Sequence, residues 1–112
     1  MTRDFRPRYI LFTINTDESV RPIQRKEMIT ALRLYCHLMF NCSLNEKKIY
    51  LTRFNGEKGI VRCKHTEKQT TINLLQAITH INTHPVTIQT IATSGTIKTL
   101  IQKHDTDDSL VN

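Results

Sequence analysis

The chain has 112 residues, which is enough for one domain and leaves no room for a second. With 38% hydrophobic and 23% charged residues, its composition excludes a disordered or low-complexity chain. Sixteen Lys and Arg residues against ten Asp and Glu residues give a net charge of +6, which favours a polyanionic partner, nucleic acid before an anionic membrane. We expect a single domain at residues 1–104, followed by a polar, acidic tail at 105–112.

The cysteines and the hydropathy of the chain indicate where it works. Cys36, Cys42 and Cys63 are odd in number and show no CxxC spacing, which argues against a disulfide framework and a zinc knuckle. We therefore expect free cysteines with structural roles in a reducing compartment. No stretch approaches the ~18 apolar residues of a membrane span, and residues 1–8 do not resemble a signal peptide. These observations predict a cytoplasmic protein without a membrane partner.

The first predicted elements are a strand and a helix. Residues 9–14 have strong β-propensity and apolar side chains on both faces, which predicts an interior strand. Between residues 23 and 40 apolar side chains recur at intervals of three and four, which predicts an amphipathic helix packed on a sheet. Residues 41–48 are predicted to connect this helix to the next strand.

The centre of the chain, residues 49–65, is the stretch around which we expect the fold to be organised. Two short runs rich in β-branched residues flank the loop 55–59, whose asparagine and two glycines permit the positive φ angles that a reversal needs. This pattern predicts a β-hairpin. Strict alternation along its first strand would place Phe54 on the face opposite Leu51.

The last third of the chain is predicted to contain a helix, a strand and a short helix. Residues 66–69 have the spacing of a capping box for a helix that runs to Ile81 and is stopped by Pro85. Residues 86–92 alternate as a strand, and residues 96–103 have helical spacing. The resulting order predicts an α+β fold, a ferredoxin-like βαββαβ sandwich. In it a four-stranded antiparallel sheet carries two main helices on one face, and a short C-terminal helix shields part of the other.

Neither a catalytic site nor a metal site is predicted by the sequence. The five histidines show no HExxH or comparable spacing, and no Gly-rich phosphate loop is present. His80 and His84 are four residues apart, but Pro85 would end the helix that they would need to share. We therefore expect no catalytic residue, and no metal or other cofactor bound by the chain itself.

Basic side chains of the predicted hairpin are the first candidates for binding. The predicted third strand, residues 59–64, carries no aromatic side chain for stacking on unpaired bases, so contacts with the phosphates of structured RNA fit it better. The alternative is a solvated hairpin edge whose cations pair with the carboxylates of the chain. The candidate cations are Arg53, Lys58, Arg62 and Lys64, and the carboxylates of the alternative belong to Glu46, Glu57 and Glu67.

Residues Ser94, Gly95 and Thr96 form the second candidate. If Thr96 begins a helix, the free amides of its first turn would bind an anion, and Lys98 would add a positive charge beside them. In the alternative, Ser94 is a plain N-cap and Gly95 serves only a tight turn. The motif alone does not decide between the two.

Three blocks of the sequence resemble one family, that of ribonuclease P protein component 2. The blocks are Arg8-Tyr9-Ile10-Leu11-Phe12, then Arg53-Phe54 with Gly59-Ile60-Val61-Arg62-Cys63, and Ser94-Gly95-Thr96-Ile97-Lys98. They occur in the right order over almost the entire chain. Arg8, at the start of the first block, completes our candidate RNA-binding residues. The compact length is more similar to archaeal members than to eukaryotic ones.

The resemblance implies a subunit of the ribonucleoprotein that removes the 5′ leader from precursor tRNA, with catalysis carried by the RNA and its magnesium ions. It implies ribonuclease P RNA, ribonuclease P protein component 3 and other subunits of the complex as partners, precursor tRNA as an indirect partner, and self-dimerisation as an option. Two alternatives remain: a ferredoxin-like protein-interaction or ligand-sensing module unrelated to RNA, and a small stand-alone ribonuclease.

Overall fold

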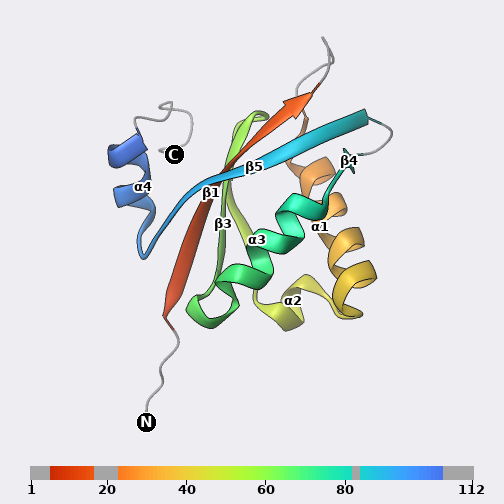
Figure 1. The fold of residues 1–112 in the computed structure, drawn as a ribbon, viewed down its shortest axis with the longest axis horizontal. Coiled ribbons are helices and arrows are strands. Elements are labelled where there is room, and N and C mark those ends of the chain that lie inside the picture. The colour runs from red at the N-terminus through yellow and green to blue at the C-terminus, as the bar shows by residue number, and fades with distance from the viewer. Residues whose placement is uncertain (1–5, 17–22, 82–83, 105–112) are drawn as a thin grey trace.

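The computed structural model describes residues 6–16, 23–81 and 84–104, so the predicted tail at 105–112 lies outside the described residues. An antiparallel sheet carries helices on both of its faces (Figure 1). In chain order the elements are β1 (Pro7–Thr16), α1 (Arg25–Phe40), α2 (Leu44–Lys47), β2 (Tyr50–Phe54), β3 (Lys58–Lys64), a 3-10 helix (His65–Glu67), α3 (Lys68–Ala77), β4 (His80–Ile81), β5 (His84–Ser94) and α4 (Ile97–His104).

The sheet contains five strands in the order β2-β3-β1-β5-β4. The predicted α+β class is confirmed, as is the antiparallel pairing of the strands. The prediction of a four-stranded sheet is wrong, because the short strand β4 pairs with β5 and adds a fifth strand. The long strands β1 and β3 lie in the interior of the sheet, whereas β2 forms one edge.

Strand β4 comes from residues that were predicted to end a helix. Helix α3 stops at Ala77, and Ile78 has the extended backbone angles φ −74° and ψ 111°. The following residues bond to β5 instead, where the Val86 N–H donates to the Thr79 carbonyl at 2.9 Å. Ile81 is still buried in the core, as its apolar spacing predicted. The helical spacing therefore predicted the burial of Ile78 and Ile81 correctly, but the helical backbone that it predicted for them is wrong.

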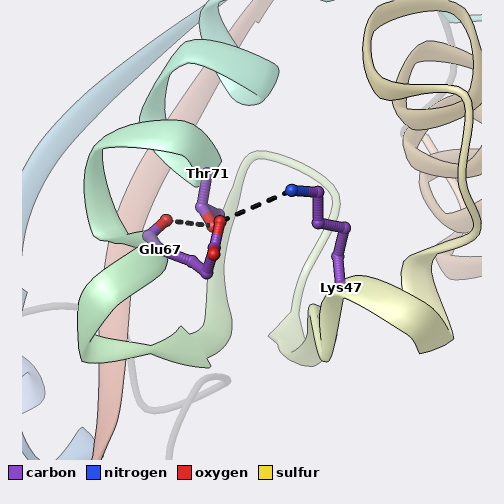
Figure 2. Close-up of polar contacts among 3 residues, drawn as sticks. All are labelled: Lys47, Glu67 and Thr71. Carbon is purple, nitrogen blue, oxygen red and sulfur yellow. Dashed lines mark hydrogen bonds and ion pairs between the residues drawn. The ribbon is translucent and has the colours of Figure 1, made fainter.

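The start of α3 also differs from the prediction. Residues His65–Glu67 form a 3-10 helix, and Glu67 is the N-cap of α3, without a side-chain cap. The predicted capping box is therefore wrong. Instead, the Thr71 hydroxyl donates to the Glu67 carbonyl at 2.8 Å, and the Glu67 carboxylate pairs with the Lys47 ammonium at 3.6 Å (Figure 2). This ion pair links the start of α3 to α2, a short helix within the predicted connector.

Separate hydrophobic clusters lie on the two faces of the sheet. Helices α1 and α3 pack on one face, where Ile10 and Phe12 belong to the main core. On the other face α4 covers a small cluster formed by Leu11, Ile60 and Leu100 (Figure 1). The alternation predicted for β1 is confirmed, since the side chains of its successive residues enter opposite clusters.

A bulge in β2 changes the predicted faces of the hairpin. The register shifts between Leu51 and Arg53, so that β2 contains one residue more than the segment of β3 that it opposes. Phe54 consequently packs against the same core as Leu51, and its ring lies 6.5 Å from that of Phe12, centroid to centroid. The prediction that Phe54 lies opposite Leu51 is wrong, because strict alternation does not survive a bulge.

The two glycines of the hairpin have different roles. Gly56 has a φ of 100° and supplies the positive angle of the turn, in which the Asn55 Oδ1 accepts the Glu57 and Lys58 amides at 2.9 and 2.8 Å. Gly59 lies in β3 instead. A Cβ atom at Gly59 would stand 2.6 Å from the Cζ of Phe12. Packing against that ring, and not the turn, therefore requires the second glycine.

Candidate nucleic-acid interface

The cations of β3 lie on the sheet face that carries α4. Val61 and Cys63 are fully buried in the main core under α1 and α3. Because successive side chains of a strand point to opposite faces, Lys58, Arg62 and Lys64 project from the other face. All three are partly exposed there. Residues i and i+2 of a strand are roughly 6.7 Å apart, so Arg62 and Lys64 place two positive charges close together.

Arg53 reaches this face through the bulge in β2. It pairs with Ile60, whose side chain lies under α4, and neighbouring partners of an antiparallel pair share one face. Its Nε atom is buried and has no hydrogen-bond partner among the residues that the structure describes. The structure thus brings the four predicted hairpin cations to one face, although regular alternation would have put Arg53 beside Leu51 on the other.

Two of the carboxylates that could neutralise these cations are engaged at α2. Glu67 pairs with Lys47 (Figure 2), and their side chains are 31% and 25% exposed. The Glu46 carboxylate accepts the Ser43 N–H at 2.8 Å in the capping box of α2. Glu57 is exposed at the tip of the hairpin. The interactions that the structure gives Glu46 and Glu67 are therefore with α2, contrary to the predicted alternative in which they neutralise the hairpin.

Two tyrosines flank Arg62 across the sheet, a feature that the sequence analysis missed. Tyr9 of β1 and Tyr50 of β2 are both register partners of Arg62, and Tyr9 also pairs with Ser94 of β5. Tyr50 is 38% exposed, and its hydroxyl donates to the Asn45 Oδ1 at 3.5 Å. Aromatic rings beside a cation can stack on unpaired bases. The sequence of β3 alone could not reveal these tyrosines, because they lie on the neighbouring strands β1 and β2.

At the start of α4 the N-cap is Thr96, not Ser94. The Thr96 Oγ1 accepts the Thr99 N–H at 3.2 Å, and the Ser94 Oγ accepts the Thr96 N–H at 3.3 Å. Helix α4 then begins at Ile97. Two amides of the predicted anion site are thus already bonded within the chain. Lys98 is exposed in the first turn of α4, so its charge can still reach a bound phosphate.

Arg8 lies beside the same turn. Its register partner is Cys63, which belongs to the face covered by α3, yet its guanidinium reaches the end of β5. A Cβ atom at Gly95 would lie 3.7 Å from the Arg8 Nη1, an ordinary van der Waals contact. The fold therefore does not require glycine at position 95, and a positive charge stands next to it.

Two of the three cysteines are poorly placed to act as nucleophiles, and the described residues hold no group of metal ligands. Burial raises the pKa of the Cys36 thiol, with a smaller contribution from Cys42, and burial likewise raises the pKa of Cys63. A buried thiol that stays protonated is a poor nucleophile. Among the side chains that the structure describes, in residues 6–16, 23–81 and 84–101, no three of His, Cys, Asp or Glu gather as metal ligands. In the same residues no helix is long and apolar enough to cross a membrane.

The sequence is similar to curated archaeal proteins over most of its length. It is 27% identical over 104 residues to ribonuclease P protein component 2 of Methanosarcina mazei, covering 92% of this chain and 87% of the relative. It is 28% identical over 97 residues to ribonuclease P protein component 2 of Methanosarcina barkeri, covering 86% of this chain and 70% of the relative. These similarities confirm the resemblance predicted from the three sequence blocks.

A structural comparison bears on the fold, and a family comparison bears on the identity of the chain. The fold matches a chain in the cryo-EM structure of yeast ribonuclease MRP with a TM-score of 0.66 at 9% identity, covering 94% of this chain and 95% of the other. At that identity the match concerns the fold alone. The model of the Rpp14/Pop5 family matches residues 8–104, which include both candidate regions. The chain therefore belongs to the Rpp14/Pop5 family.

Proposed function

We propose that this chain is a protein subunit of ribonuclease P, the ribonucleoprotein that cleaves the 5′ leader from precursor tRNA. The observation that carries the proposal is one sheet face that gathers Arg53, Lys58, Arg62 and Lys64 in a member of the Rpp14/Pop5 family. The chain contributes charge and shape to the complex, and the catalytic RNA performs the cleavage.

The proposed mechanism is electrostatic. Folded RNA brings phosphates close together, and a protein face with several cations lowers their mutual repulsion. Each phosphate neutralised in a duplex adds about 0.9 to the slope of log affinity against log salt, so the hairpin cations would make binding strongly salt-dependent. Magnesium ions held by the RNA supply the cleavage chemistry. With the cations of this chain in place, the RNA needs fewer magnesium ions to keep its active structure.

The two ends of the face have distinct tasks in this proposal. Arg62 and Lys64 contact phosphates of the folded RNA, while Lys98 and Arg8 hold a second phosphate group at the start of α4. Tyr9 lies between these two groups and Tyr50 lies on the far side of Arg62, and both offer stacking surface for an unpaired base next to the backbone. Ser94, Gly95 and Thr96 form the turn that lets the RNA backbone approach.

The partners of the chain follow from the same proposal. They are ribonuclease P RNA, ribonuclease P protein component 3 and the remaining subunits of the complex, with precursor tRNA contacted indirectly. A self-dimer of this chain, around which the partner subunit pairs, and a cytoplasmic location are further parts of it. We also propose that the four long strands with α1 and α3 form a ferredoxin-like unit to which β4 is an addition.

Reconstitution of the enzyme from its RNA and purified proteins tests the proposal. With the chain present, precursor tRNA is cleaved at a lower magnesium concentration than with the chain omitted. The chain alone leaves precursor tRNA intact. Cleavage by the isolated chain would show a stand-alone ribonuclease, and binding that does not weaken with salt would point to a module unrelated to RNA.

A further inference from the structure

The outer side of α1 exposes two leucines one helical turn apart. Leu34 is 53% exposed and Leu38 is 68% exposed. Because residues four apart are neighbours on a helix surface, the two side chains form one apolar ridge. Single exposed leucines are common, whereas apolar side chains that adjoin one another and a groove form a larger continuous surface, which is the kind that marks interaction sites. We call these two residues the α1 ridge.

A groove lies on the other flank of the same helix. It runs between α1, α2 and the edge strand β2 and has a volume of about 830 Å³. Leu32, Ile49 and Leu51 line it with apolar side chains. Arg33 and His37 also line it, and at 100° per residue they lie between the groove and the α1 ridge. The outer side of α1 therefore presents a basic stripe with apolar surface on both sides.

This arrangement favours an acidic amphipathic helix over the other candidate occupants. RNA would pair with Arg33 but would leave the α1 ridge in water. A second copy of this chain, related by a two-fold axis, would bring Arg33 and His37 towards their own like charges. An added strand would compete with Arg25, whose guanidinium donates to the carbonyl of Leu51 on the edge strand β2. A helix that carries carboxylates between apolar side chains can pair its carboxylates with the basic stripe and pack its apolar side chains on the α1 ridge and in the groove.

We propose that the outer side of α1 binds an acidic amphipathic helix of another protein subunit of the same ribonucleoprotein. The inference rests on the proposed function, and it assigns the protein partner to the side of the sheet opposite the RNA. Leucines of the bound helix cover the α1 ridge and enter the groove, and its carboxylates face Arg33 and His37. The hairpin cations and the α1 ridge lie on opposite faces of the sheet, because α4 and α1 do (Figure 1). Tyr50, on the edge strand β2, lines the groove as well.

Binding of purified ribonuclease P protein subunits from the same source, each tested singly, checks this assignment. One subunit binds the unaltered chain, and the double variant Leu34→Gln, Leu38→Gln binds it at least tenfold more weakly. Glutamine has a helix propensity close to that of leucine, and both positions are exposed, so the variant keeps its fold. Arg33→Glu weakens the same complex, most strongly at low salt. Lys64→Glu, on the opposite face, leaves it within twofold.

A photo-crosslinking residue in place of Leu38 then identifies the neighbour in the assembled complex. The expected adduct joins this chain to an acidic helix of a protein subunit. An adduct with RNA or with a second copy of the chain would overturn the inference, as would the failure of every subunit to bind. The double variant is also tested against ribonuclease P RNA, which it binds within twofold of the unaltered chain. If neither form bound the RNA, the proposed function itself would fall, whereas unchanged subunit binding by the variant would remove only this inference.

Discussion

Phe12 packs directly on the backbone of Gly59, so that a Cβ atom there would stand only 2.6 Å from its Cζ. Gly59→Ala should therefore destabilise the fold by about 1–3 kcal/mol, because the ring, which is fully buried and also stacks on Phe54, has little room to move. Urea unfolding followed by circular dichroism measures the change. Stability equal to that of the unaltered protein would show that the sheet yields at this point.

Gly95 is the matched control for the substitution at Gly59. A Cβ atom placed at Gly95 has its nearest neighbour outside the adjacent residues, the Arg8 Nη1, 3.7 Å away. Gly95→Ala should therefore change the free energy of unfolding by less than about 1 kcal/mol. If the RNA backbone approaches this turn as proposed, the added methyl group should weaken binding of ribonuclease P RNA severalfold. Filter binding at constant salt measures the effect. Unaltered affinity would exclude close contact at this turn and confine the interface to the hairpin cations.

Tyr50 tests whether the face also stacks on a base. Replacing the ring by Tyr50→Leu should lower affinity for ribonuclease P RNA by about 1–3 kcal/mol, the range measured for loss of a stacked base. Tyr50→Phe is the control, since it keeps the ring and removes only the hydroxyl that bonds to Asn45. Equal losses in the two variants would argue that the hydroxyl, and not stacking, is what matters.

The three cysteines should differ in their reactivity towards alkylating agents. Cys36 and Cys63 are buried and burial raises their pKa values, so iodoacetamide should modify Cys42 first at pH 8, while all three react in urea. The same shift predicts that the free energy of unfolding falls as the pH rises above the ordinary thiol pKa, because the unfolded chain then releases protons that the folded chain retains. Mass spectrometry of alkylated peptides measures the order. Rapid labelling of Cys63 in the folded protein would contradict its burial.

Local patterns in the sequence predicted the elements whose side chains follow one regular period. The alternation of Ile10, Leu11 and Phe12 gave both faces of β1 because a strand has a period of two. The bulge beside Arg53 and the close approach of Gly59 to Phe12 depend on residues far away in the sequence, so no local pattern reveals them. The row of tyrosines around Arg62 was missed for the same reason.

Helix ends were predicted less well than helix interiors. Residues 78–81 keep the apolar spacing of α3, but their backbone groups bond to β5, and tertiary pairing overrides the helical pattern there. Thr66 has the right spacing for a capping box, and yet the 3-10 turn before α3 moves the cap to Glu67. In the candidate site, charge identified the residues, while the structure supplied the face that they share.

The central claim, that this chain supports a catalytic RNA by positive charge, is tested most directly by the magnesium dependence of reconstituted ribonuclease P. Lys64→Glu reverses one charge on the proposed RNA face, and Lys68→Glu makes the same change at the exposed start of α3 on the other side of the sheet. The account predicts that Lys64→Glu raises the magnesium concentration needed for half-maximal cleavage of precursor tRNA, whereas Lys68→Glu leaves it unchanged. An equal magnesium requirement for both variants and the unaltered chain would contradict the claim.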